Sequence, residues 1–164
     1  MPTVTRLFSL AALSLLVVAA SPAPADADLT GFIGFSPSPA SHGATGLAVG
    51  GGFMIVAFEF EYSHLGEDLE DRAPSLTTVS GNVLVQTPVP IGGFQFYGTL
   101  GGGGYRERLD LRQETHVETN LGGGVKYTVA GPFRLRFDYR IFSLLGSPLE
   151  KKVHRFYAGA NLKF

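Results

Sequence analysis

The chain of 164 residues contains no cysteine and no tryptophan, and only 16% of its residues are charged. Without cysteine, a disulfide framework and a thiolate metal site are both excluded. The net charge of -1 leaves no basic excess, so no nucleic-acid partner is expected. After the N-terminal region, no apolar run reaches the roughly 18 residues that a membrane helix needs. What the chain has instead is 22 glycines and 12% aromatic residues.

The N-terminal segment has the features of a secretory signal peptide. Arg6 supplies a positive charge, an apolar run follows it and ends at Ala20, and Ala25-Asp26-Ala27 gives the small-x-small cleavage pattern. A retained anchor helix is the alternative, but the apolar run is short for a membrane span. We therefore expect a cleaved signal peptide at residues 1–27 and a folded domain at residues 28–164.

Beyond the signal peptide, apolar and polar side chains alternate along eight segments, which predicts strands. The alternation is clearest in residues 153–164, and it repeats in residues 133–141, where one face is apolar and the other carries four charges. Those charges cannot enter a dry apolar core unpaired. The predicted strands cover residues 29–35, 45–54, 56–65, 75–87, 91–106, 115–129, 133–141 and 153–164.

The predicted connections alternate between long polar loops and tight reversals, as in bacterial membrane barrels with long outer loops and short periplasmic turns. The long loops are expected at residues 37–43, 66–74, 107–114 and 146–152. The tight reversals are expected at residues 50–52, 88–90 and 130–132. The predicted fold class is therefore all-β, an eight-stranded antiparallel up-and-down transmembrane β-barrel.

A membrane location requires the strands to close on themselves, because hydrocarbon offers no partner for backbone N–H and C=O groups. The apolar faces would then contact lipid, and the charged faces would line a lumen just wide enough for side chains. A soluble, lipocalin-like ligand-binding barrel with the opposite arrangement is the alternative. The charges expected to pair in the lumen are Glu59, Glu61, Lys126, Arg134, Arg136, Asp138, Arg140, Arg155 and Lys163.

The last residues form a recognisable pattern, Tyr157-x-Gly159-x-x-Leu162-x-Phe164. It resembles the assembly signal of outer-membrane proteins, which implies that the barrel-assembly machinery reads the terminal strand. With the signal peptide and the eight strands, the whole folded domain resembles the small OmpA/OmpX-type barrel domains. This resemblance implies a monomer in the outer membrane of a Gram-negative host, surrounded by lipid and lipopolysaccharide.

The lumen charges allow two roles. In the first, they form a static plug, and the barrel has a structural or surface-interaction function. In the second, Glu59 and Glu61 exchange partners among the arginines and open a narrow porin-like channel. Buried charges must pair in either case, because an unpaired buried ion costs several kcal/mol.

No catalytic, cofactor or metal site is expected. Ser41-His42 and Ser63-His64 are adjacent pairs, but neighbouring strand residues point to opposite faces and cannot form a nucleophile with its base. A lipid-modifying enzyme is therefore not expected.

The glycine runs at 101–104 and 122–124 lack the Lys-Ser/Thr of a phosphate loop. The acidic loop from Glu67 to Arg72 is interpreted as solvated, with cation or partner binding as the alternative. The histidines do not converge on one face: His42, His64, His116 and His154.

Overall fold

The computed structural model describes residues 26–37, 41–67, 73–110 and 112–164. In these ranges the chain forms eight strands, and no helix there is long and apolar enough to cross a membrane. The predicted signal peptide lies almost entirely outside the described residues. The strands are β1 (Asp26–Ser36), β2 (His42–Phe53), β3 (Val56–Leu65), β4 (Ser75–Gln86), β5 (Phe94–Leu109), β6 (Arg112–Ala130), β7 (Phe133–Leu144) and β8 (Lys152–Lys163).

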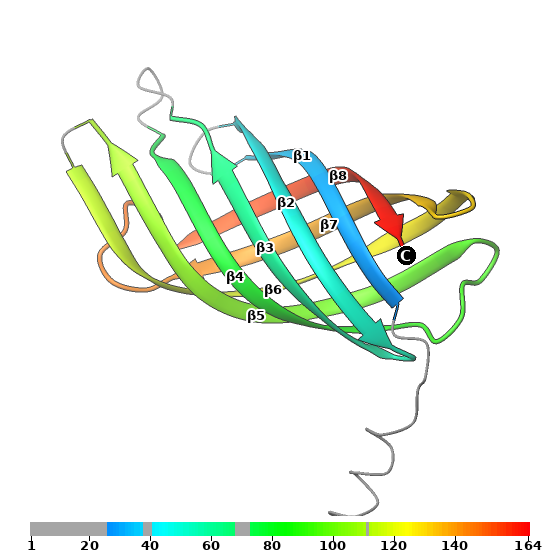
Figure 1. Ribbon diagram of the computed structural model, residues 1–164. Coiled ribbons are helices and arrows are strands. Elements are labelled where there is room, and N and C mark those ends of the chain that lie inside the picture. The colour runs from blue at the N-terminus through cyan, green and yellow to red at the C-terminus, as the bar shows by residue number, and fades with distance from the viewer. Residues whose placement is uncertain (1–25, 38–40, 68–72, 111) are drawn as a thin grey trace, which may run out of the picture.

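Each strand pairs antiparallel with the next, and β1 pairs with β8 to close the barrel (Figure 1). At the closing seam Asp28 lies opposite Lys163, and Ala27 exchanges two backbone hydrogen bonds of 2.9 Å with Phe164. Strand β1 therefore begins two residues before the predicted domain boundary at residue 28. The predicted fold class is confirmed.

Several predicted boundaries are wrong. Gly50–Gly52 do not form a reversal but lie inside β2, and the chain turns at Met54 and Ile55, where Met54 has a φ of 51°. Strand β5 starts at Phe94 rather than residue 91, because Gly92 and Gly93 adopt positive φ in the preceding turn. Glycines inside a strand resemble turn residues in sequence, and only the pairing register separates the two.

The predicted polar loop at 107–114 is also wrong. Strand β5 continues to Leu109 and β6 begins at Arg112, so the connection is a tight hairpin with Asp110 at a φ of 52°. In this region Glu107 faces inward while Arg106 and Arg108 face outward. Polar residues on both faces suggested a loop, but a strand that leaves the membrane can carry them on either side.

The barrel has two different ends. Both Asp26 and Phe164 lie at one end with the turns at 54–55, 87–93 and 131–132, and we call it the turn end. The opposite end, which we call the loop end, holds the ends of β1, β3, β5 and β7 and the starts of β2, β4, β6 and β8 (Figure 1). An even number of strands places the start of β1 and the end of β8 at the same end of the barrel.

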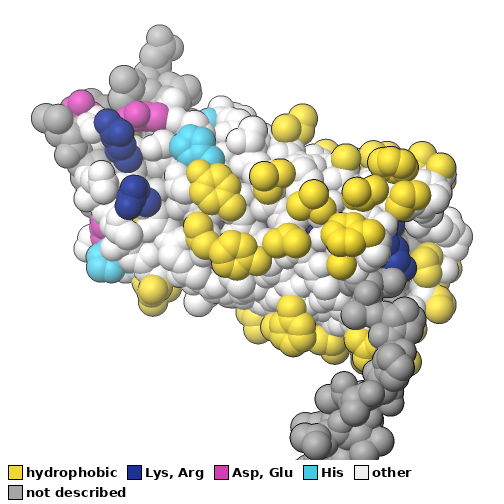
Figure 2. Space-filling view, viewed as in Figure 1, with side chains coloured by type: hydrophobic (Ala, Val, Ile, Leu, Met, Phe, Trp, Pro, Cys, Tyr) yellow, Lys and Arg dark blue, Asp and Glu magenta, His cyan; other side chains and the backbone are white. Residues whose placement is uncertain are grey.

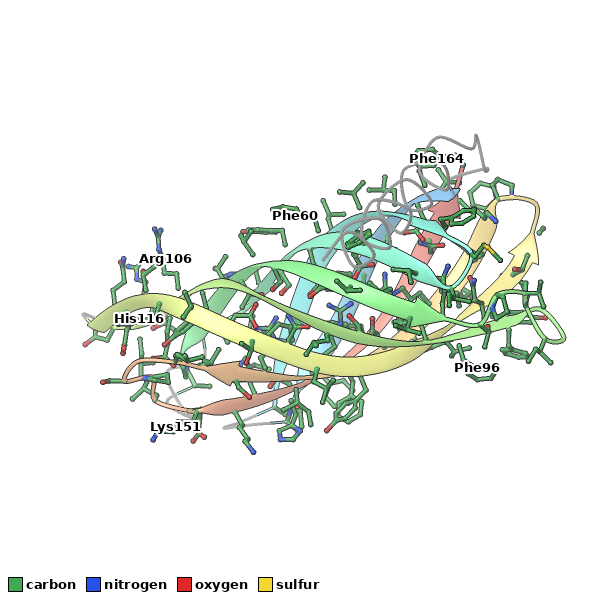
Figure 3. All side chains as sticks on the ribbon, turned by 90° about the horizontal axis from the view of Figure 1, so that it is seen from below. Phe60, Phe96, Arg106, His116, Lys151 and Phe164 are labelled. Atoms are coloured by element: carbon green, nitrogen blue, oxygen red, sulfur yellow. The ribbon has the colours of Figure 1, made fainter. Side chains whose placement is uncertain are left out.

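Apolar side chains cover the outside of the wall (Figure 2). Phe60 and Phe96 are more than half exposed and point away from the barrel (Figure 3), whereas Glu59 and Arg140 on the inward face are at most 4% exposed. A soluble barrel has the reverse arrangement, with its apolar residues inside. The lipocalin-like alternative is therefore wrong.

Candidate functional site: the closed lumen

Most of the charged residues predicted for the lumen lie inside the barrel, each at most 9% exposed. Lys163 differs, because it is only partly buried at the turn end of β8. The side chains come from strands on opposite sides of the barrel, so closure of the sheet brings them together. The fully enclosed ones are Glu59, Glu61, Lys126, Arg134, Arg136, Asp138, Arg140 and Arg155.

The centre of the lumen holds a network of three carboxylates and two guanidinium groups. Glu59 accepts hydrogen bonds from Arg136 and, at 2.8 Å, from Arg140. Asp138 accepts from the same two arginines, at 2.7 and 3.1 Å. The Nη1 atom of Arg140 lies 2.9 Å from the Oε2 atom of Glu61. These shared contacts offset the desolvation cost of burying the ions, which would be prohibitive if any stood alone.

Tyr97 on β5, which β6 separates from β7, joins this network. Its hydroxyl donates a hydrogen bond of 2.8 Å to Asp138 and accepts one of 2.7 Å from the Nε atom of Arg136. The Arg136 guanidinium also lies 5.1 Å from the centroid of the Tyr97 ring. Tyr97 shares the inward parity of β5, but its contacts with β7 depend on strand closure and register, which the sequence does not contain.

A second cluster closes the turn end around Asp28. This carboxylate lies 2.5 Å from the Nζ atom of Lys126 and 3.2 Å from the Nη2 atom of Arg134. Arg134 donates a further hydrogen bond of 2.7 Å to Asn161, whose amide donates to Thr30. Sequence reasoning missed Asp28 because it used this residue only to mark a cleavage site. The available signal was that Asp28 occupies an even-numbered position of β1, and the side chains at those positions face the lumen.

Toward the loop end, Arg155 and Glu118 have neutral partners. Arg155 donates hydrogen bonds of 2.6 and 3.1 Å to the hydroxyls of Ser63 and Thr78. Its guanidinium lies 4.0 Å from the centroid of the Phe142 ring. Glu118 accepts a hydrogen bond of 2.6 Å from Ser80. The alternation of β6 had assigned Glu118 to the polar face, but the predicted charge network did not include it.

Beyond these charges, the loop end of the lumen contains a layer of apolar side chains, which we call the apolar cap, together with the buried side chains of His42 and Glu107. Its members are buried and contact one another across the barrel. The space that remains beside His42, Leu65 and Val153 is about 10 Å³, at most one water molecule. The described side chains of this layer therefore leave little space at this level of the lumen. The apolar cap consists of Leu65, Leu76, Phe142, Leu144 and Val153.

Glycines make room for the large inward side chains. Phe32 of β1 lies over Gly46 of β2 and Gly159 of β8, and a Cβ atom at either glycine would collide with it. The Phe32 ring packs on Tyr157 with centroids 4.4 Å apart. Tyr157 and Gly159 of the predicted assembly signal therefore have packing roles in the lumen, while Leu162 and Phe164 lie on the outward face.

Two histidines form outward-facing pairs that sequence reasoning missed. His64 Nδ1 lies 2.9 Å from the hydroxyl of Thr77 across β3 and β4, and the hydroxyl of Tyr139 lies 2.8 Å from Nδ1 of His154. A hydroxyl beside an imidazole is the start of a nucleophile–base pair. Among the described residues, no carboxylate hydrogen-bonds the ring of His64.

The other two histidines lie apart from these pairs. His42 is the first residue of β2 and is buried, rather than lying in a loop, while His116 is exposed near Glu114. In the described part of the chain, no three potential ligands from His, Asp and Glu are grouped closely enough to hold a metal ion.

Comparison with known sequences gives one family. A sequence profile of the outer membrane protein beta-barrel domain matches residues 8–164. No curated protein sequence matches the chain significantly.

Solved structures with the same fold include two bacterial surface barrels. The N-terminal β-barrel domain of Pseudomonas aeruginosa OprF is 16% identical, with a TM-score of 0.65 over 85% of this chain and 97% of that one. Neisserial surface protein A is 17% identical, with a TM-score of 0.66 over 85% and 96% of the two chains. The outer membrane enzyme PagL is 10% identical, with a TM-score of 0.54 over 82% and 98%. At these identities the likeness concerns the fold alone.

Proposed function

The chain belongs to the outer membrane protein beta-barrel domain family, and from this premise we propose that it is a monomeric structural and surface-interaction barrel whose lumen stays closed to ions. Its membership confirms the resemblance to small eight-stranded outer-membrane barrels. We propose that the loop end faces outward from the cell and the turn end faces the periplasm, as in bacterial barrels with short periplasmic turns.

The apolar cap is the observation that carries this proposal. An apolar constriction excludes ions, because an ion that enters it must give up its hydration shell. Phe142 and Leu65 are at most 1% exposed in the middle of this layer. Below it, the ion pairs of Arg136 and Arg140 cross the lumen and occupy its centre. A barrel closed in this way has its outer loops as the surface available to partners.

Planar-bilayer recording of the full-length protein tests the closed lumen. The unmodified protein should insert and show no current steps above baseline. A Leu65→Ser/Phe142→Ser double variant should admit water to the apolar cap and give measurable steps. Heat-modifiable gel migration of both proteins would establish that each is folded.

A narrow channel is the second candidate, and one feature favours it. Asn82, Thr99 and Asn120 on β4, β5 and β6 have buried side-chain polar atoms without a hydrogen-bond partner among the described residues. Such a row would suit a polar path along one wall of the lumen. Reproducible current steps from the unmodified protein would favour this candidate and overturn the closed lumen.

We propose that the barrel is not an enzyme, although PagL shares its fold. The His64–Thr77 pair is the nearest approach to catalytic chemistry, and an acyl-transfer site also needs a third group to orient the base. Incubation with lipid A followed by mass spectrometry should show no loss or gain of an acyl chain. A mass change that disappears in Thr77→Val would establish catalysis by this pair.

Export is proposed to depend on the signal peptide at residues 1–27. N-terminal sequencing of protein from the outer-membrane fraction should give Asp28 as the first residue. Any other first residue would contradict this boundary.

We also propose that the barrel-assembly machinery recognises the terminal strand through Phe164. This residue is 68% exposed, so its packing contributes little to the folded wall. Phe164→Ser should therefore reduce the amount of protein in the outer membrane while leaving refolding into detergent unchanged. Phe133→Ser, at an outward site that is 62% exposed at the same end, is the matched control.

A further inference from the structure

The outward face of the wall carries a one-sided set of charges. Among the described strand residues, the Lys and Arg side chains that face outward are Arg106 and Arg108 on β5 and Lys152 on β8. The carboxylates on the described strands have inward parity, as Glu107 shows between the two arginines. All three outward cations lie at the loop end. The outward charge carried by the strands at this end is therefore positive, although Glu67 and Asp110 are also exposed beyond the strand ends.

Arg106 and Arg108 form the densest part of this surface. They occupy successive outward positions of β5, and both are exposed. Arg106 projects away from the wall (Figure 3). Neither side chain has an ion pair or hydrogen bond with any described residue, in contrast to the arginines of the lumen. Next to Arg106, Thr77 is its register partner on β4 and bonds to His64.

The apolar wall begins immediately below these arginines. The next outward positions toward the turn end are Val79 on β4, Gly104 on β5 and Val117 on β6, which are register partners. Gly104 leaves the outward face of β5 without a side chain between the two valines, and Gly102 does the same between Gly81 and Thr119. Basic side chains beyond the edge of the hydrophobic ones are visible in Figure 2. A partner here meets positive charge at one end and an apolar wall at the other.

We propose that Arg106 and Arg108 bind the phosphate groups of an anionic lipid in the outer leaflet, whose acyl part lies along β5 over Gly104 and Gly102. Guanidinium groups match phosphate oxygens with paired N–H donors. Basic residues at a membrane surface also gain from the negative potential of anionic lipid. The site rests on the proposed orientation in the outer membrane, but it does not depend on the closed lumen.

Native mass spectrometry of the full-length protein in detergent micelles, titrated with diphosphorylated lipid A, tests this site. The unmodified protein should bind the lipid with defined stoichiometry, and more weakly as salt rises. Arg106→Gln/Arg108→Gln should lower the apparent affinity by on the order of tenfold. Lys151→Gln/Lys152→Gln removes the same charge at the loop end of β8 and should leave the affinity unchanged.

The apolar part of the site has its own variant. A Cβ atom at Gly104 would have as its nearest neighbour the His116 carbonyl oxygen at 3.8 Å, so Gly104→Leu should fold normally. This variant should nevertheless weaken lipid A binding, because the leucine would occupy the outward surface of β5 that the glycines leave without side chains. Heat-modifiable migration would verify folding of each variant, and bilayer recording should give the same result for all of them.

Three results would overturn the proposal. Equal weakening by the β5 and β8 double variants would mean general charge attraction without a site. Equal binding of dephosphorylated lipid A would exclude phosphate recognition. Displacement by inorganic phosphate or a sulfated polysaccharide at the same concentration as the lipid would assign the arginines to a soluble anion. None of these results bears on the proposal that the lumen is closed to ions, which conductance measurements test separately.

Discussion

Strands β7 and β2 line the same lumen in opposite ways. The inward positions of β7 from Arg134 to Phe142 hold only large side chains, four of them charged, and all are buried. Beyond His42, the inward positions of β2 hold only alanine and glycine: Ala44, Gly46, Ala48, Gly50 and Gly52. The lumen is thus filled mainly from one wall, and the other provides the space.

This difference follows from the reach of the arginines. Arg136 and Arg140 cross the lumen to the carboxylates of β3, which is the strand beside β2. Side chains on β2 would compete for that volume. At Gly50 a Cβ atom would lie 3.3 Å from the Asp28 carboxylate, and at Gly46 it would meet the Phe32 ring. A barrel of eight strands has room for one such layer of long side chains.

The largest expected effect comes from breaking the β7 contacts at their acceptor. Glu59→Gln removes the charge shared by Arg136 and Arg140 and should lower the unfolding free energy by about 3–5 kcal/mol. Urea unfolding from lipid vesicles, followed by circular dichroism because the chain has no tryptophan, would measure it. Glu67→Gln, whose carboxylate accepts an exposed backbone hydrogen bond from Asp110, should cost below about 1 kcal/mol. Equal costs would mean that the network is not stabilising.

A smaller loss is expected where β5 supports β7. Tyr97→Phe removes one hydrogen bond to Asp138 and one from Arg136 while keeping the ring, which should cost about 1.5–3 kcal/mol. The same unfolding measurement applies. Tyr62→Phe, on the outward face of β3, is the control and should be nearly neutral. A neutral Tyr97→Phe would show that the two ions are satisfied without the hydroxyl.

Filling the space on β2 tests the other half of the comparison. Gly46→Val introduces a side chain where Phe32 already lies, and overpacking of this kind costs about 1–3 kcal/mol. Gly81→Val, on the outward face of β4 where a Cβ atom meets nothing, should not destabilise the barrel. If both variants were tolerated equally, the small residues of β2 would not be required for packing.

The smallest effect is expected at a lumen position that contacts neither network. Thr99 is 3% exposed and its hydroxyl has no partner among the described residues. Thr99→Val keeps the shape and should change the unfolding free energy by less than about 0.5 kcal/mol, or raise it slightly. A loss above about 1 kcal/mol, seen in the same unfolding experiment, would mean that this hydroxyl takes part in the lumen contacts.

Several features of the site followed from strand parity. The charged face of residues 133–141 was assigned to the lumen because charges at every second position must share one side of a strand. The partners were not predictable in the same way. Asp28 and Lys126 meet although 98 positions separate them in the chain. His64 and Thr77 were missed for the same reason, since their contact depends on the β3–β4 register.

The apolar cap shows the limit of parity most clearly. Leu65, Phe142 and Val153 share the inward faces with charged residues, and their separation into a layer depends on height along the barrel. By itself, the sequence determined that eight amphipathic strands must form and that polar and apolar side chains lie on opposite faces, because alternation is a local property. Only the tertiary structure decided which charges pair, which end is closed and where the outward arginines lie. Those outcomes depend on strand register and closure, which join residues that no local pattern connects.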